Sequence, residues 1–207
     1  MKSLLIVGVV ADTHVPDRAT SLHPALIPTL KEKKVDLILH AGDICIPRIL
    51  EELNQVAPVT AVCGNRDLVF GNKLPHIQKL ELAGVPVILT HGHGSWLNYM
   101  NDKVHHFFEG YRLERYMNTV RKTARVYVNH SLETIPTVFV FGHTHRPANI
   151  WQEGSLLFNP GSPSVFQKVD FRPTLGLLYF SADAKVEGEI IELQGVSLKK
   201  RNWIAET

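Results

Sequence analysis

The chain has 207 residues and a mass of 23.3 kDa, a length that favours one domain over two. With 44% hydrophobic and 20% charged residues, its composition is that of a globular protein and excludes the disordered and collagen-like classes. Its formal net charge of +2 is too small to imply a nucleic-acid-binding surface by charge alone. The two cysteines, Cys45 and Cys63, have no CxxC spacing, so we expect small buried side chains in a reducing compartment.

The apolar runs are short. Segments such as 4–11 and 138–141 fall far below the roughly 18 to 20 residues that span a bilayer. The first run ends at Asp12 with no small-residue cleavage site after it, unlike a signal peptide. We therefore expect a cytoplasmic protein with no membrane partner.

The first third of the chain alternates apolar runs with amphipathic segments. Strands are expected over 4–11, 35–40 and 59–63, and helices over 24–33 and 47–54. This βαβαβ order predicts parallel strands with right-handed crossovers. Sheets of this kind bind ligands outside the carboxyl ends of their strands.

Beyond residue 75 the pattern changes to short strands. Segments 77–82 and 86–90 read as a hairpin, and 137–141 as another buried strand. The remaining strands, spaced by Gly, Asp and Pro, are predicted to form an antiparallel meander; they span 150–151, 155–158, 175–181 and 186–193.

The segment 96–132 lacks proline and is rich in aromatic and basic residues, which predicts a helical insert in a single domain spanning 1–207. Its aromatic side chains could form a core-facing stripe and its basic ones a solvated face. The alternative is a lid over the ligand crevice, or a homodimer contact.

Polar residues follow each predicted strand of the central part of the chain. Because these strand ends converge, the following seven side chains are expected to share one crevice: Asp12, His14, Asp43, Asn65, His91, His143 and His145. Carboxylates, imidazoles and one amide oxygen without a thiolate suit Mn²⁺, Fe, Zn²⁺ or Co²⁺ better than Ca²⁺ or a sulfur-bound zinc. Seven ligands are too many for one ion, so we expect two ions that share a carboxylate.

Five sequence blocks, in order, resemble those of the calcineurin-like metallophosphoesterases. They are D-x-H at 12–14, G-D at 42–43, G-N-R-D at 64–67, H-G at 91–92 and G-H-T-H at 142–145. The resemblance extends over about residues 4–193 and points to the small bacterial and archaeal phosphodiesterase branch, which also contains retromer-type scaffold subunits. It implies an α/β fold: a β-sandwich of mixed sheets flanked by helices, with a metal site at strand carboxyl ends.

The resemblance also implies roles for individual residues. One metal would be held by Asp12, His14, Asp43 and His145, and the other by Asp43, Asn65, His91 and His143. The cofactors would be two divalent ions, foremost Mn²⁺, with Fe, Zn²⁺, Co²⁺ or Ni²⁺ as alternatives. A hydroxide between the ions would attack phosphorus, with Asp43, Asn65 and Arg66 as catalytic residues.

Arg66 departs from the family pattern, because many members carry a histidine after the asparagine of the third block. An arginine stays protonated, so it can bind phosphate but is a poor general acid, and leaving groups of low pKa should be favoured. The alternative is a surface salt bridge, for instance with Asp67. His93 could bind substrate and supply the missing proton, or it could face solvent.

The expected function is hydrolysis of a small anionic phosphodiester. The alternatives are a non-catalytic scaffold of the same fold that binds protein partners, and a nuclease, which the near-neutral charge disfavours. The segment 159–162, with sequence N-P-G-S, could place backbone N–H groups near a phosphate or could be an ordinary turn.

Overall fold

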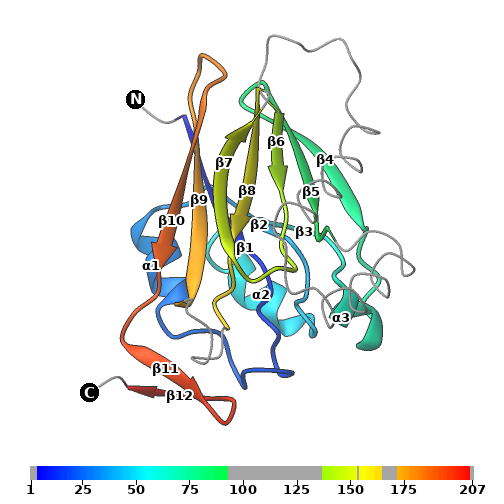
Figure 1. Ribbon diagram of the computed structural model, residues 1–207, viewed down its shortest axis with the longest axis vertical. Helices are drawn as coiled ribbons and strands as arrows, with labels where there is room; N and C mark the ends of the chain where they lie inside the picture. The colour runs from blue at the N-terminus through cyan, green and yellow to red at the C-terminus, as the bar shows by residue number, and fades with distance from the viewer. Residues whose placement is uncertain (1–3, 93–136, 153, 165–171, 206–207) are drawn as a thin grey trace.

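The computed structural model describes residues 4–92, 137–152, 154–164 and 172–205 (Figure 1). The predicted helical insert at 96–132, and with it the lid or dimer contact, lies outside the described residues, as does His93. Among the described helices, none is long and apolar enough to cross a membrane.

The first of two five-stranded sheets contains the predicted parallel strands. β1 (Leu5–Val10), β2 (Leu37–His40) and β3 (Val59–Ala61) run parallel, joined through α1 (Leu26–Glu32) and α2 (Arg48–Asn54). Their register pairs Val10 with His40 and His40 with Ala61, so the three strands end at one edge. The prediction of a βαβαβ unit is confirmed.

The second sheet has the strand order β4-β5-β6-β8-β7. β4 (Ile77–Leu82) and β5 (Val85–Thr90) form the predicted hairpin. β6 (Thr137–Val140) lies parallel to both β5 and β8 (Ser155–Pro160), whereas β7 (Pro147–Gln152) pairs antiparallel with β8 at the edge. The sheet is therefore mixed.

The predicted antiparallel meander at the end of the chain is only partly confirmed, because its four strands form two antiparallel pairs in different sheets. β7 and β8 belong to the second sheet, whereas β9 (Thr174–Phe180) and β10 (Val186–Glu192) join the first as β10-β9-β1. The reason is burial: Leu177 of β9 packs with the helix-side core and Leu178 with the core between the sheets. A strand that is apolar on both faces is stable in a sheet interior, here beside β1.

The two sheets pack face to face over an apolar core that includes Val7, Leu39, Leu89, Val140 and Phe158. The opposite face of the first sheet is covered by α1 and α2, whose Leu26, Leu30, Ile49 and Leu53 are fully buried. This is the expected β-sandwich of mixed sheets with flanking helices. The packing of these layers holds the strand ends in place, and the loops that carry the polar residues begin at those ends.

Three short elements were not predicted. α3 (Asn65–Val69) begins at a predicted metal ligand, and β11 (Val196–Lys199) pairs with β12 (Asn202–Ala205) in a C-terminal hairpin. The hairpin is anchored to the loop before α1, where Trp203 Nε1 donates to the carbonyl of Ser21 at 3.0 Å.

Candidate metal centre

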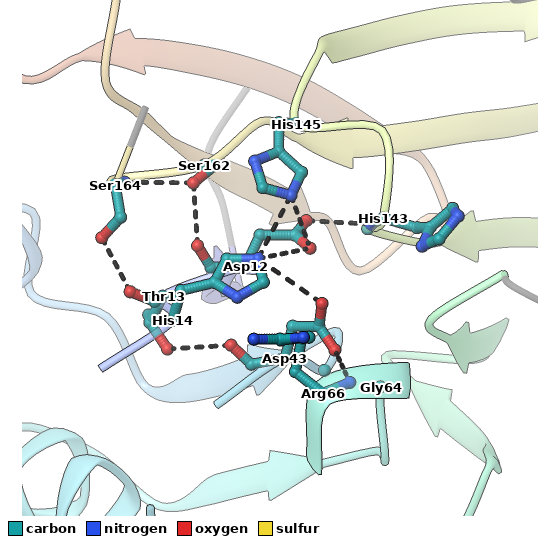
Figure 2. Close-up of polar contacts among 12 residues, drawn as sticks. Asp12, Thr13, His14, Asp43, Gly64, Arg66, His143, His145, Ser162 and Ser164 are labelled. Atoms are coloured by element: carbon teal, nitrogen blue, oxygen red, sulfur yellow. Dashed lines mark hydrogen bonds and ion pairs between the residues drawn. The ribbon is translucent and has the colours of Figure 1, made fainter. Parts of the chain in front are cut away.

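All seven predicted ligands lie together in loops at the carboxyl ends of strands from both sheets. Asp12 and His14 follow β1, Asp43 follows β2, and Asn65 begins α3 after β3. His91 follows β5, and both His143 and His145 follow β6. Figure 2 shows Asp12 and Asp43 from the first sheet facing His145 from the second.

One group of donor atoms surrounds the ring of His14. Its Nε2 lies 3.2 Å from His145 Nε2 and 3.4 Å from Asp43 Oδ2. Asp12 Oδ1 completes the group, 3.4 Å from His145 Nε2 and 3.8 Å from His14 Nε2. Donor atoms bound to one ion at about 2.0 to 2.2 Å lie roughly 3 to 3.5 Å apart, so this spacing suits a shared cation.

A second group gathers around the side-chain oxygen of Asn65. Asn65 Oδ1 lies 3.2 Å from His91 Nε2 and 3.1 Å from His143 Nδ1. His91 Nε2 is also 3.6 Å from Asp43 Oδ1. Asp43 therefore lies between the groups, with one carboxylate oxygen toward each.

The residues present fit a metal. Asp12 Oδ1 is buried and has no hydrogen-bond partner among the residues that the structure describes, a costly arrangement for a carboxylate unless a cation or a proton meets it. The donors are imidazole nitrogens and carboxylate or amide oxygens, a set typical of transition metals. Asp12, His14 and His145 can each offer one donor atom within 4.8 Å of the others, as can Asp12, Asp43 and His91.

Burial controls the charges in the metal-free site. It raises the pKa of Asp12 to about 8 and raises that of Asp43 as well. It lowers the pKa of His14, and lowers that of His145 to about 3. For His91 the burial effect is outweighed by the carboxylates of Asp43 and Asp12, which raise its pKa. Without metal, Asp12, Asp43 and His91 therefore keep their protons to a higher pH than they would in the unfolded chain.

The ligand loops hold unusual backbone conformations. The following candidate ligands have positive φ angles: Asp12 (55°), His14 (48°), Asp43 (57°), His143 (70°) and His145 (58°). Such left-handed conformations cost on the order of 1 kcal/mol or more each and persist where the surroundings hold them. Backbone hydrogen bonds supply this restraint, from Asp12 N to Gly42 O and from His14 N to Asp43 O, each at 2.9 Å.

Asp67 is fully buried, so the alternative of a surface salt bridge between Arg66 and Asp67 does not hold. Its carboxylate accepts the backbone N–H groups of Asp43, Ile44, Cys45 and Gly64 at 2.7 to 3.0 Å. The sequence carried a signal for this role, because an acidic residue three positions after Gly64 forms a capping box at the start of α3. Asp67 thus joins the loop after β2 to the loop after β3.

Arg66 lies beside the centre but pairs with Asp17, not with Asp67. Its Nε and Nη2 both donate to Asp17 Oδ2, at 2.8 and 2.6 Å, and its backbone N–H donates to Asp43 Oδ1 at 2.7 Å. A second arginine, Arg18, also lies beside the centre, with its Nη1 2.8 Å from His145 Nδ1. No sequence pattern pointed to Arg18 or Asp17, because both belong to an irregular loop.

The segment 159–162 supports the ligand loops by hydrogen bonds. Ser162 Oγ donates to the carbonyl of Asp12 at 2.8 Å (Figure 2). Asn159 Nδ2 donates to the carbonyl of Gly142 at 2.9 Å. Nearby, Ser164 Oγ donates to the carbonyl of Thr13 at 2.7 Å. These side chains hold the backbone on either side of the donor atoms.

Comparisons with known proteins agree with this architecture. The profile of the calcineurin-like phosphoesterase superfamily domain matches residues 5–182. A probable metallophosphoesterase of Methanothermobacter thermautotrophicus is 34% identical over 187 residues, which cover 90% of this chain and 92% of the relative.

Two solved structures share the fold. Vps29 of Entamoeba histolytica, a single mutant, superposes with a TM-score of 0.63 at 19% identity, covering 92% of this chain and 100% of that one. A structure described as a novel archaeal phosphodiesterase has a TM-score of 0.54 at 19% identity, covering 90% and 100%. The chain belongs to the calcineurin-like phosphoesterase superfamily.

Proposed function

We propose that this protein is a phosphodiesterase that hydrolyses a small anionic ester at a centre of two divalent ions. Asp12, His14, Asp43 and His145 would hold one ion, and Asp43, Asn65, His91 and His143 the other. The observation that carries the proposal is the position of Asp43, whose two carboxylate oxygens lie 3.4 Å from His14 Nε2 and 3.6 Å from His91 Nε2.

Bound divalent ions would supply an activated water as nucleophile near neutral pH and would neutralise negative charge on the phosphate. The chain's own part is to orient the ligands. His91 Nδ1 lies 2.7 Å from the carbonyl oxygen of Ala41, which can only accept a hydrogen bond. That assigns the proton to Nδ1 and leaves the Nε2 lone pair directed at Asn65 and Asp43.

The same residues restrict movement during reaction. The backbone N–H of Arg66 donates to Asp43 Oδ1, so the shared carboxylate has a fixed orientation before any ion binds. Preorganised polar groups need no rearrangement when charge develops on a phosphate. Manganese is the ion we propose, with Fe, Zn²⁺, Co²⁺ or Ni²⁺ as alternatives, because the nitrogen and oxygen donor set suits all of them.

Arg66 remains a proposed phosphate-binding residue at the rim, where its ion pair with Asp17 holds the guanidinium. A guanidinium is not a proton donor at working pH, so esters with leaving groups of low pKa should react fastest. His93 stays a proposed substrate-binding residue on sequence grounds. The cytoplasm stays the proposed compartment, supported by Cys45 and Cys63, which are both free and buried.

A second candidate function is a scaffold that binds protein partners, favoured by the structural likeness to Vps29. The complete set of seven donor residues in one cluster favours catalysis, because a scaffold has no need to keep them. A nuclease is the third candidate, and a net charge of +2 gives it little support.

The deciding experiment measures hydrolysis of bis-p-nitrophenyl phosphate and p-nitrophenyl phosphate by metal-stripped protein, with and without added Mn²⁺. We expect Mn²⁺ to restore cleavage, and the diester to be cleaved with the higher kcat/KM. Cleavage of neither ester by protein with a measured metal content would favour the scaffold. Cleavage of single-stranded DNA that falls steeply with rising salt would favour the nuclease.

A further inference from the structure

Arg18 is a cation that faces the candidate metal centre and pairs with no carboxylate among the described residues. It lies in the loop between β1 and α1, and its backbone N–H donates to the carbonyl of His14 at 2.7 Å, which fixes its position beside the ligands. Its Nη1 lies 2.8 Å from His145 Nδ1. Within the described part of the chain, Arg18 forms no ion pair, in contrast to Arg66, whose guanidinium is held by Asp17.

The contact with His145 is incompatible with metal binding by the same ring. Arginine is only a donor, so His145 Nδ1 must accept and its single proton must lie on Nε2. Yet Nε2 is the nitrogen that faces His14 and Asp12, the other donors of the first group. A neutral ring that binds an ion through Nε2 carries its proton on Nδ1, so it can no longer accept from Arg18.

The guanidinium must therefore find another acceptor in the metal-loaded protein. Its charge cannot be removed by losing a proton, and it would lie beside bound cations that repel it. An anion that lies between the guanidinium and the metal ions would remove this repulsion. A phosphate group offers several acceptor oxygens and negative charge, and the planar fork of arginine matches its geometry.

We infer that Arg18 is a phosphate-binding residue of the substrate site, released from His145 when that ring takes up metal and then donating to non-bridging oxygens of the ester. The inference rests on the proposed function, because it assumes metal at His14, Asp12 and His145. It assigns different tasks to the two arginines. Arg66 is tethered by Asp17 at the rim, whereas Arg18 is the cation whose donors become available to the substrate.

The test measures binding of inorganic phosphate to Mn²⁺-loaded protein by isothermal titration calorimetry, with metal content determined on the same samples. The variants are Arg18→Ala, Arg18→Lys and the control Arg48→Ala, which removes an exposed arginine paired with Glu52 on α2. We expect Arg18→Ala to keep wild-type metal content and to bind phosphate about 10- to 100-fold more weakly, as loss of a charged hydrogen bond implies. Arg18→Lys should lie between, and Arg48→Ala should match wild type.

Three results would overturn the inference. The first is wild-type phosphate affinity in Arg18→Ala, and the second is no phosphate binding by the metal-loaded wild type. The third is loss of metal from both Arg18→Ala and Arg18→Lys, which would show that Arg18 only positions His145. Hydrolysis is scored separately: a wild type that binds phosphate through Arg18 but cleaves neither nitrophenyl ester would leave the inference standing and contradict the proposed function.

Discussion

The carboxylate of Asp67 accepts the backbone N–H of Asp43 at 2.9 Å, so one buried aspartate holds the backbone of another. Asp43 is at a positive φ of 57°, a conformation that needs such support. The same carboxylate oxygen accepts the N–H of Gly64 at 2.8 Å, which ties together the loops after β2 and β3. Candidate ligands from separate strands thereby keep a common geometry.

Asp67→Ala should destabilise the protein by about 3 kcal/mol or more, because several buried N–H groups lose their acceptor at once. The free energy of unfolding is obtained from urea titrations of metal-free protein. Asp183→Ala, which removes an exposed carboxylate paired with Lys185, is the matched control and should unfold at the wild-type urea concentration. A wild-type midpoint for Asp67→Ala would show that Asp67 does not hold these loops.

Asp43→Asn should abolish ester hydrolysis and release at least one ion. The amide keeps the shape of the side chain but loses the charge, and one of its two positions becomes an N–H₂ group that cannot ligate. Metal per chain by mass spectrometry and diester hydrolysis with Mn²⁺ are measured together, with Asp183→Asn as control. Equal activity in Asp43→Asn would sink the proposal of a shared carboxylate.

Much of the candidate site was predictable, because strand periodicity and chain order locate strand ends. Asp12 and His143 are 131 positions apart in sequence, yet each follows a buried strand, and the backbone N–H of His143 donates to Asp12 Oδ2 at 2.9 Å. A sheet with its strand ends at one edge brings such residues together whatever their separation along the chain.

The parts that escaped prediction depend on tertiary contacts. Arg18 and Asp17 lie in an irregular loop with no periodicity, so only the folded structure shows that one contacts His145 and the other Arg66. The predicted placement of β9 was wrong for a related reason. The turns around it fit an antiparallel strand, but the identity of its partner, β1, depends on which sheet can bury both of its apolar faces.

Gly64→Ala should disrupt the centre although Gly64 has an ordinary extended backbone. A Cβ there would lie 2.2 Å from Asp43 Oδ1 and 2.3 Å from Asp43 N, so the shared carboxylate or its loop would have to move. We expect activity to fall at least about tenfold, as loss of about 1.4 kcal/mol or more of transition-state stabilisation implies. Gly84→Ala, in the β4–β5 turn with nothing within 4 Å of the added atom, should keep wild-type kcat/KM. Equal activities in the two variants would contradict the close approach of Gly64 to Asp43.

Arg66→Ala should raise KM for the diester or lower kcat several-fold without loss of metal. The guanidinium is tethered at the rim by Asp17, while the backbone N–H that supports Asp43 survives the substitution. Steady-state kinetics with bis-p-nitrophenyl phosphate separate the two parameters, and Arg48→Ala again serves as control. Kinetics identical to those of the wild type would mean that Arg66 does not bind substrate and serves only in its ion pair with Asp17.

The stability of the metal-free protein should fall as pH rises from 7.5 to 8.5. Asp12 has a pKa of 3.8 when unfolded and about 8 when folded, so in this range the folded chain binds the extra proton and loses that advantage as pH rises. His91 acts in the same direction, because its pKa is raised in the folded state.

Four buried histidines act in the opposite direction, but only near their unfolded pKa. Burial lowers the pKa values of His14, His23, His40 and His145 from 6.5, so above about pH 7.5 these rings are almost entirely neutral in both the folded and the unfolded chain. Each proton retained by the folded state can contribute a slope of up to about 1.4 kcal/mol per pH unit, measurable by urea unfolding in chelator at several pH values. Added Mn²⁺ displaces these protons, so its stabilising effect should be larger at pH 8.5 than at pH 7.5. A stability that is flat or rises with pH in chelator would mean that Asp12 is ionised without metal, and that its buried oxygen is neutralised by another group.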